Sequence, residues 1–193
     1  MSTALAAGIV SLRTLEENDS ARLFAWRNRR DVARYMYTDH EIAPDEHAAW
    51  FVKAIADSKR QYWIIELDGA PVGLCNLYDI DTTHRRCAWA YYLADPATRG
   101  RGVGTYVEYF VLAHVFDKMN LNKLTCEVFL GNVAVWKLHE SFGFEREALY
   151  RDHIFKAGQF EDVVALAMRA ETWRGIKPAL RARLIDKHFT PPA

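Results

Sequence analysis

Three glycines and two arginines lie close together in Arg99-Gly100-Arg101-Gly102-Val103-Gly104. An alternating apolar run precedes them at residues 87–93, and an apolar helical pattern follows from about residue 103 to residue 118. Glycines allow close approach of the backbone, and the free N–H groups at the start of a helix bind anions, which arginines also attract. The segment therefore predicts a phosphate cradle. It lacks the third glycine of the dinucleotide-binding fingerprint and the Gly-Lys-Ser/Thr of the ATP-binding loop.

Two strands and one helix must position this cradle. Asp95-Pro96 ends the first strand, because proline cannot continue a hydrogen-bonded ladder. Residues 123–129 form a second strand beyond the helix. Strand, helix and strand make a βαβ unit, so we expect parallel strands joined by a right-handed crossover. A ligand would lie at the carboxyl end of the first strand, against the helix N-terminus.

A second motif follows the second strand, and its sequence is Asn132-Val-Ala134-Val-Trp136-Lys-Leu138-His139-Glu-Ser-Phe-Gly143-Phe144. With this motif and Arg99-x-x-Gly102-x-Gly104, the chain resembles the GNAT superfamily of acetyl-coenzyme A-dependent N-acetyltransferases. The glycine segment fits the superfamily's pyrophosphate loop, Arg/Gln-x-x-Gly-x-Gly/Ala. The later segment is similar to its Asn-x-x-Ala-x-x-Leu-Tyr-x-x-x-Gly-Phe pattern. The resemblance covers residues 9–169.

This resemblance implies a mixed α/β fold, in which a mostly antiparallel seven-stranded sheet has helices on both faces. In that fold two parallel strands splay apart, here residues 87–93 and 123–129, and the pantetheine of acetyl-CoA inserts between them. Acetyl-CoA is thus the implied cosubstrate, and no metal is implied. Asn132 could also be a helix cap, which is compatible with a cofactor contact. The implied cofactor-binding residues are Tyr91, Leu93, Arg99, Gly100, Arg101, Gly102, Val103, Gly104, Thr105, Asn132 and Trp136.

Acetyl transfer from a thioester to an amine needs a base, donors for the oxyanion and a stabilised leaving thiolate. The main-chain N–H of Leu93 is the candidate oxyanion donor. Glu127, between apolar neighbours in a strand, is the candidate base; the alternative is a surface carboxylate on a half-exposed strand. The superfamily usually has a tyrosine acid at the position of His139. An imidazolium there could protonate the thiolate, or the histidine could simply pack within the helix.

Aromatic and basic side chains predict the acceptor site. Short patterns such as Trp26-Arg-Asn28 and Asp68-Gly-x-x-Val-Gly73 are similar to N-acetyltransferases of the pseudaminic acid pathway, which act on a UDP-linked 4-amino-4,6-dideoxy-N-acetylaltrosamine. Such an acceptor needs arginines for its diphosphate and aromatic rings for uracil and sugar. The predicted acceptor residues are Arg30, Met36, Tyr37, His47, Trp50, Tyr78 and Trp89.

We therefore predict a UDP-amino sugar acceptor and a role in flagellin or surface glycosylation. Two alternatives stay open. One is a peptide N-terminal, polyamine or antibiotic acetyltransferase on the same fold. The other is an acyl-CoA-binding module without turnover.

The composition fits one domain, residues 1–170, followed by a C-terminal helix and tail at residues 171–193. The formal net charge is zero, which gives no electrostatic reason to expect nucleic acid or an anionic membrane as a partner. The three cysteines lack metal-ligand spacing and are predicted to be buried free thiols in a reducing compartment. Without a leader pattern before Gly8 or a membrane-spanning run, we predict a cytoplasmic monomer or homodimer.

Overall fold

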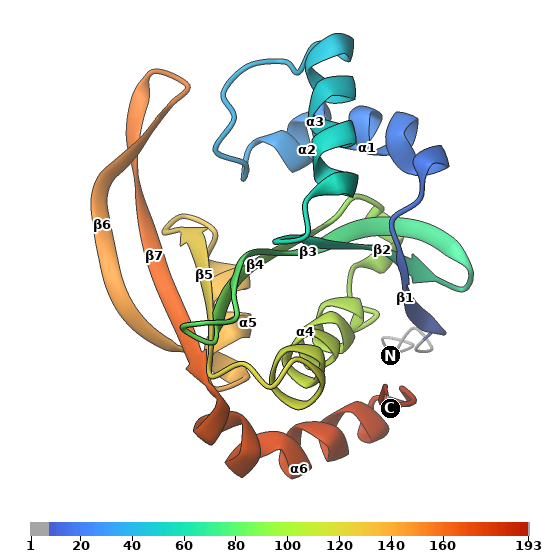
Figure 1. The fold of residues 1–193 in the computed structure, drawn as a ribbon, viewed down its shortest axis with the longest axis vertical. Helices are drawn as coiled ribbons and strands as arrows, with labels where there is room; N and C mark the ends of the chain where they lie inside the picture. The colour runs from blue at the N-terminus through green and yellow to red at the C-terminus, as the bar shows by residue number, and fades with distance from the viewer. Residues whose placement is uncertain (1–7, 193) are drawn as a thin grey trace, which may run out of the picture.

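A single sheet with strand order β1-β2-β3-β4-β5-β7-β6 organises residues 8–192, the part of the chain that the computed structural model describes (Figure 1). Within these residues only β4 and β5 are parallel neighbours, which confirms the predicted mixed, mostly antiparallel sheet. Residues 1–7, where a leader was sought, lie outside the described part. The strands are β1 Val10–Thr14, β2 Gln61–Leu67, β3 Ala70–Asp81, β4 Arg86–Leu93, β5 Lys123–Phe129, β6 Glu145–Lys156 and β7 Gln159–Arg169.

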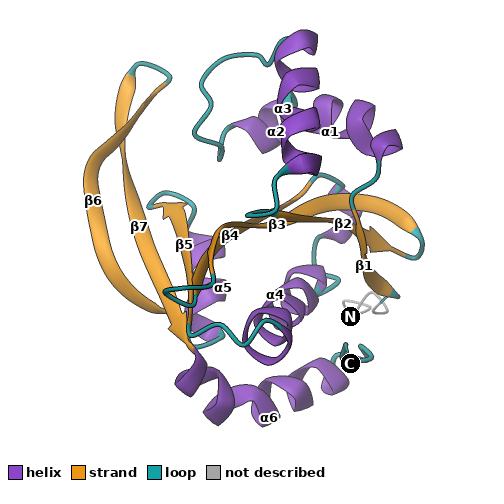
Figure 2. Ribbon diagram, viewed as in Figure 1, coloured by secondary structure: helices purple, strands orange, loops and turns teal. Residues whose placement is uncertain are grey.

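Helices cover both faces of the sheet (Figure 2). The smaller core lies under α1 and α3 and is built around Leu23, Phe51 and Ile64. The larger core lies between the opposite face and α4, α5 and α6. The helices are α1 Ser20–Arg27, α2 Arg30–Ala33, α3 Pro44–Ala56, α4 Val103–Ala113, α5 Val133–Ser141 and α6 Ala170–Asp186.

Helix α4 is buried on nearly all sides, because the sheet covers one side and α6 another. It continues into one π-helical turn, His114–Lys118. A C-terminal helix was expected within residues 171–193, and α6 runs from Ala170 to Asp186. Trp173 fixes it to α4, because its fully buried ring meets Tyr109 edge-on and its indole N–H donates to Asp117. Helix α6 thereby covers the apolar outer side of α4.

Strands β4 and β5 separate after a short parallel ladder. The ladder pairs Arg86 with Lys123 and ends where Ala88 faces Thr125, although both strands continue. On the other edge of β4, the N–H of Ala94 donates to the carbonyl of Val72, so the N–H of Leu93 points toward β5. This geometry confirms the predicted splay and leaves the backbone of β4 unpaired where a ligand can use it.

The ends of the strands follow the turn chemistry of the sequence. Asp68-Gly69 and Ala157-Gly158 both have two residues with positive φ, as two-residue hairpins require. The three cysteines are buried free thiols, as predicted. Between residues 8 and 192, no helix is both long and apolar enough to cross a membrane. The same residues contain no cluster of three potential metal ligands.

Candidate active site

A cavity of about 510 Å³ opens where β4 and β5 splay apart. Both separated strands line it, β4 through residues 89–93 and β5 through residues 126–129. Alternation along β5 directs Cys126 and Val128 into the core beside α5, and it directs Glu127 to the opposite face, where α2 and α3 lie. The cavity therefore has one side toward α5 and another toward the N-terminal helices.

A second hollow of about 370 Å³ lies over the glycine segment. Gly100, Gly102 and the first turn of α4 form one wall, and α5 forms the other. The two hollows have Tyr91, Leu93 and Arg99 in common. They therefore adjoin, and together they extend from the start of α4 to the side of α2.

The predicted cradle has the backbone geometry that an anion site requires. Gly100 and Gly102 have φ of 73° and 75°, and Gly102 is the N-cap of α4. The next N–H groups have no partner within the helix and face the hollow. Gly104 lines the hollow and also serves packing, since a Cβ there would lie 3.1 Å from the Tyr91 hydroxyl oxygen and 3.3 Å from Leu138.

Gly102→Ala is expected to weaken CoA binding as well as stability. A left-handed alanine costs about 1–2 kcal/mol, and its Cβ would also lie 3.0 Å from the Phe189 ring, which shifts the start of α4. Gly69→Ala is the matched control, because Gly69 has φ of 78° and open space around it. Thermal unfolding should show a lower melting temperature for both variants. Titration with CoA should show a lower affinity only for Gly102→Ala. Equal CoA affinity in the two variants would contradict a cradle at this turn.

Two residues predicted to contact the cofactor point elsewhere. The guanidinium of Arg101 forms an ion pair with Asp68 at 2.8 Å, so it does not line the hollow. Trp136 is buried and donates its indole N–H to the carbonyl of Leu130. Asn132 is the N-cap of α5 but makes no side-chain capping bond, and it lines the cavity.

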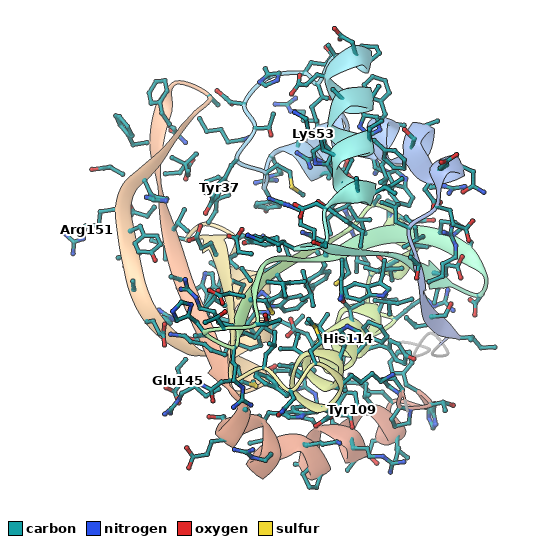
Figure 3. The ribbon with its side chains drawn as sticks, viewed as in Figure 1. Tyr37, Lys53, Tyr109, His114, Glu145 and Arg151 are labelled. Atoms are coloured by element: carbon teal, nitrogen blue, oxygen red, sulfur yellow. The ribbon has the colours of Figure 1, made fainter. Side chains whose placement is uncertain are left out.

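Glu127 and Tyr37 meet on the side of β5 that faces the N-terminal helices. The Tyr37 hydroxyl donates to Oε2 of Glu127 at 2.8 Å, and its ring meets Phe129 edge-on. Figure 3 shows Tyr37 between the N-terminal helices and the end of β5. Burial and the neighbouring carboxylate raise the pKa of Tyr37, so it remains a hydrogen-bond donor. The sequence assigned these residues to two roles, and the structure joins them in one contact.

His139 lies on the opposite face of the splay and forms a buried pair. Its Nδ1 is 2.5 Å from Oε1 of Glu108 on α4; His139 is 3% exposed and Glu108 is fully buried. The contact is an ion pair without the alignment of a hydrogen bond. Burial alone would lower the pKa of His139, but the Glu108 carboxylate outweighs this and raises it above its ordinary value. This shift favours the imidazolium form of His139, which lies at the cavity wall among the rings of Trp89, Tyr91 and Phe144.

The other predicted acceptor residues fall into two groups. Met36, Trp50 and Trp89 line the cavity. Three others do not line it: His47, Tyr78 and Arg30. His47 is buried, with its Nε2 2.9 Å from the Ser20 carbonyl oxygen. The Arg60 guanidinium lies over the ring of Tyr78, and Arg30 is exposed to solvent. Several polar side chains that line the cavity were not among the predicted site residues: Arg27, Asp31, Arg60, Tyr62 and Asn76. Of these, only Arg27 lies within one of the sequence patterns given above, Trp26-Arg-Asn28.

A splayed parallel pair, a glycine turn at a helix start and two adjoining hollows between them are the features expected of an acyl-CoA-dependent transferase. Residues 10–145 match the model of the acetyltransferase (GNAT) domain, and the chain belongs to this family. It is an N-acetyltransferase, and acetyl-CoA is its cosubstrate.

Known relatives differ in their acceptors. Spermidine N(1)-acetyltransferase of Escherichia coli K12 is 26% identical over 82% of this chain and 85% of its own length. Acetyltransferase PseH of Campylobacter jejuni strain 81-176 is 27% identical over 70% of this chain and 85% of its own. Spermidine N-acetyltransferase from Vibrio cholerae, solved with CoA and spermine, superimposes with a TM-score of 0.79 at 23% identity, covering 86% of this chain and 98% of that one. The last match concerns the fold alone.

Proposed function

We propose that this enzyme acetylates the 4-amino group of a UDP-linked amino-dideoxy sugar, as in pseudaminic acid biosynthesis for flagellin or surface glycosylation. The observation that carries the proposal is the charge of the acceptor cavity. Arg27, Arg60 and Arg99 line it, against the carboxylates of Asp31 and Glu127. Asp31 is paired with Arg29, and Arg60 is paired with Asp57 at 3.2 Å. Arg27 and Arg99 therefore outnumber Glu127 among the charged lining residues that have no ion-pair partner between residues 8 and 192. Such a surface suits a diphosphate better than a polycation.

Two polar atoms of this cavity support a polar ligand there. Among the described residues, Nε of Arg27 and the hydroxyl of Tyr92 are buried without a hydrogen-bond partner, and both residues line the cavity. Buried polar groups are rarely left unsatisfied, so a ligand group is expected to pair with them. Trp50 and Tyr62, edge-on to each other at 5.9 Å, add an aromatic surface for a base or a sugar ring.

The catalytic roles follow from the two faces of the splay. Glu127 takes the proton of the acceptor amine on the side of α2 and α3. The N–H of Leu93, which points toward β5, stabilises the tetrahedral oxyanion. On the α5 side the charged His139 stabilises the leaving thiolate. Transfer is then direct: the amine nitrogen bonds to the acetyl carbon, the C–S bond breaks, Glu127 holds the amine proton, and CoA leaves as the thiolate.

A polyamine is the second candidate acceptor. Spermidine N-acetyltransferases stand among the relatives, and their match covers more of this chain than that of PseH. The arginines that line the cavity disfavour this acceptor, because each guanidinium would repel a polycation.

Direct binding of UDP and of spermidine to the enzyme–CoA complex separates the two acceptors. We expect UDP to bind and spermidine not to bind. Arg60→Met should lower the affinity for UDP by about 10- to 100-fold, which corresponds to the loss of one charge-assisted hydrogen bond to phosphate. Arg174→Met on α6, exposed and on the far face, is the control and should change nothing. Binding of spermidine but not UDP would overturn the nucleotide-sugar proposal in favour of the polyamine.

A further inference from the structure

The loop that joins α2 to α3 is held from outside by the β6–β7 hairpin. This acceptor loop, residues 34–43, brings Tyr35 and Met36 to the cavity wall and Tyr37 to Glu127. Its later end is fixed by the residue that caps α1, since the Asn28 side chain bonds both the N–H and the carbonyl of Ile42. In its first half, the N–H groups of Tyr35 and Met36 donate to carbonyls of α2, and Arg27 reaches the Thr38 hydroxyl at 3.4 Å. The hairpin tip adds a further contact from the other side (Figure 1).

Lys156, at the end of β6, makes this contact with its ammonium group. Nζ donates to three main-chain carbonyls, those of Ala33 at 3.1 Å, Met36 at 2.7 Å and Thr38 at 2.6 Å. An ammonium has three N–H donors in tetrahedral directions, so each one has an acceptor here. The planar fork of an arginine would not reproduce this arrangement.

A second contact beside Lys156 fixes the same segment. The N–H of Ala157 donates to both carboxylate oxygens of Asp39, at 3.0 and 3.1 Å. Ala157 and Gly158 are the two residues of a tight turn with positive φ, which is a rigid mounting for the contact. Hydrogen bonds that involve a charged group are worth more than neutral ones, and this segment receives several of them over a few residues.

We propose that Lys156 is a positioning residue for the acceptor: through the carbonyls of Ala33, Met36 and Thr38 it holds the acceptor loop so that Tyr37 meets Glu127. This inference rests on the proposed placement of the acceptor beside Glu127. Lys156 is not among the residues that line the cavity, so it acts on the loop and not on the substrate. The amine-binding geometry would then depend on a residue more than a hundred positions away in the sequence.

Hydrogen exchange and kinetics of Lys156→Met test the proposal. We expect the amides of residues 34–39 to exchange about tenfold faster or more, because charge-assisted bonds to the loop are lost. The KM for the acceptor should rise by about tenfold or more for the same reason, while the KM for acetyl-CoA stays unchanged. Lys53→Met is the matched control, since Lys53 is an exposed lysine of α3 (Figure 3) and should leave both readouts as they are.

The two readouts separate this inference from the proposed function. Exchange requires no acceptor, so a failure of the UDP-sugar to react would leave the exchange result valid. Unchanged exchange at residues 34–39, or a parallel rise of both KM values, would overturn the role of Lys156. If Lys156→Met does not fold, Lys156→Arg provides the same comparison with a smaller increase, because it keeps the charge but not the three-way geometry.

Discussion

Glu127→Gln is expected to lower kcat/KM for the acceptor amine by about 10²- to 10⁴-fold, the usual contribution of a general base. The amide has the shape of the carboxylate and can still accept the hydrogen bond from Tyr37, but it cannot take the proton of the amine. Glu127 is exposed on β5, so the melting temperature should be unchanged. Steady-state release of free thiol from acetyl-CoA, with the acceptor varied, measures the effect.

Tyr37→Phe is the control for this substitution. It leaves the carboxylate in place and removes only its donor, so we expect a loss of about tenfold, the value of one hydrogen bond. The KM for acetyl-CoA should be the same in both variants, because neither residue lines the glycine hollow. Wild-type turnover in Glu127→Gln would show that another group, or bulk water, removes the proton.

Glu108→Leu is expected to destabilise the fold by about 1–3 kcal/mol, because it leaves the buried imidazole of His139 without the partner of its Nδ1. Chemical denaturation at neutral pH measures this loss. The double variant Glu108→Leu/His139→Phe should recover most of it, since a hydrophobic pair often replaces a buried ion pair without cost. Its turnover should still be low if the charge of His139 stabilises the thiolate. Glu145→Leu, which alters an exposed carboxylate on β6, is the control (Figure 3).

The same pair makes stability depend on pH with a defined sign. The pKa of His139 is raised in the folded protein above the unfolded value of about 6.5. The stabilisation is therefore complete below that unfolded value and declines as the pH rises through the folded pKa. The double variant should lack this decline. If Glu108→Leu lowered the free energy of unfolding by no more than Glu145→Leu does, a charged pair in the core would be contradicted.

The parts of the site that the sequence predicts are those with local causes. Glycines at positions 100, 102 and 104 predict a turn that leads into a helix, and Asp95-Pro96 predicts the end of a strand. The splay of β4 from β5 is predictable by resemblance to the superfamily, and the structure confirms it. Local pattern does not, however, reveal the ion pair between the Arg101 guanidinium and Asp68, which lies 33 positions earlier in the sequence.

The parts that the sequence does not predict are contacts between distant segments. Lys156 reaches carbonyls about 120 residues earlier, and a carbonyl leaves no mark in a residue pattern. Glu108 offers one usable signal, a lone carboxylate within the apolar run of α4. A charge in such a helix needs a buried partner, and His139 on α5 is that partner. Pattern alone cannot say which of the seven histidines it is.

The measurement that tests the account most directly is free-thiol release from acetyl-CoA with three acceptors side by side: a UDP-4-amino-dideoxy sugar, spermidine and a ribosomal N-terminal peptide. The arginines of the cavity predict rapid turnover with the UDP-amino sugar and little with the polyamine. They also predict inhibition by added UDP, which would occupy the same site. Turnover with spermidine alone, unaffected by UDP, would contradict the assignment of an anionic acceptor.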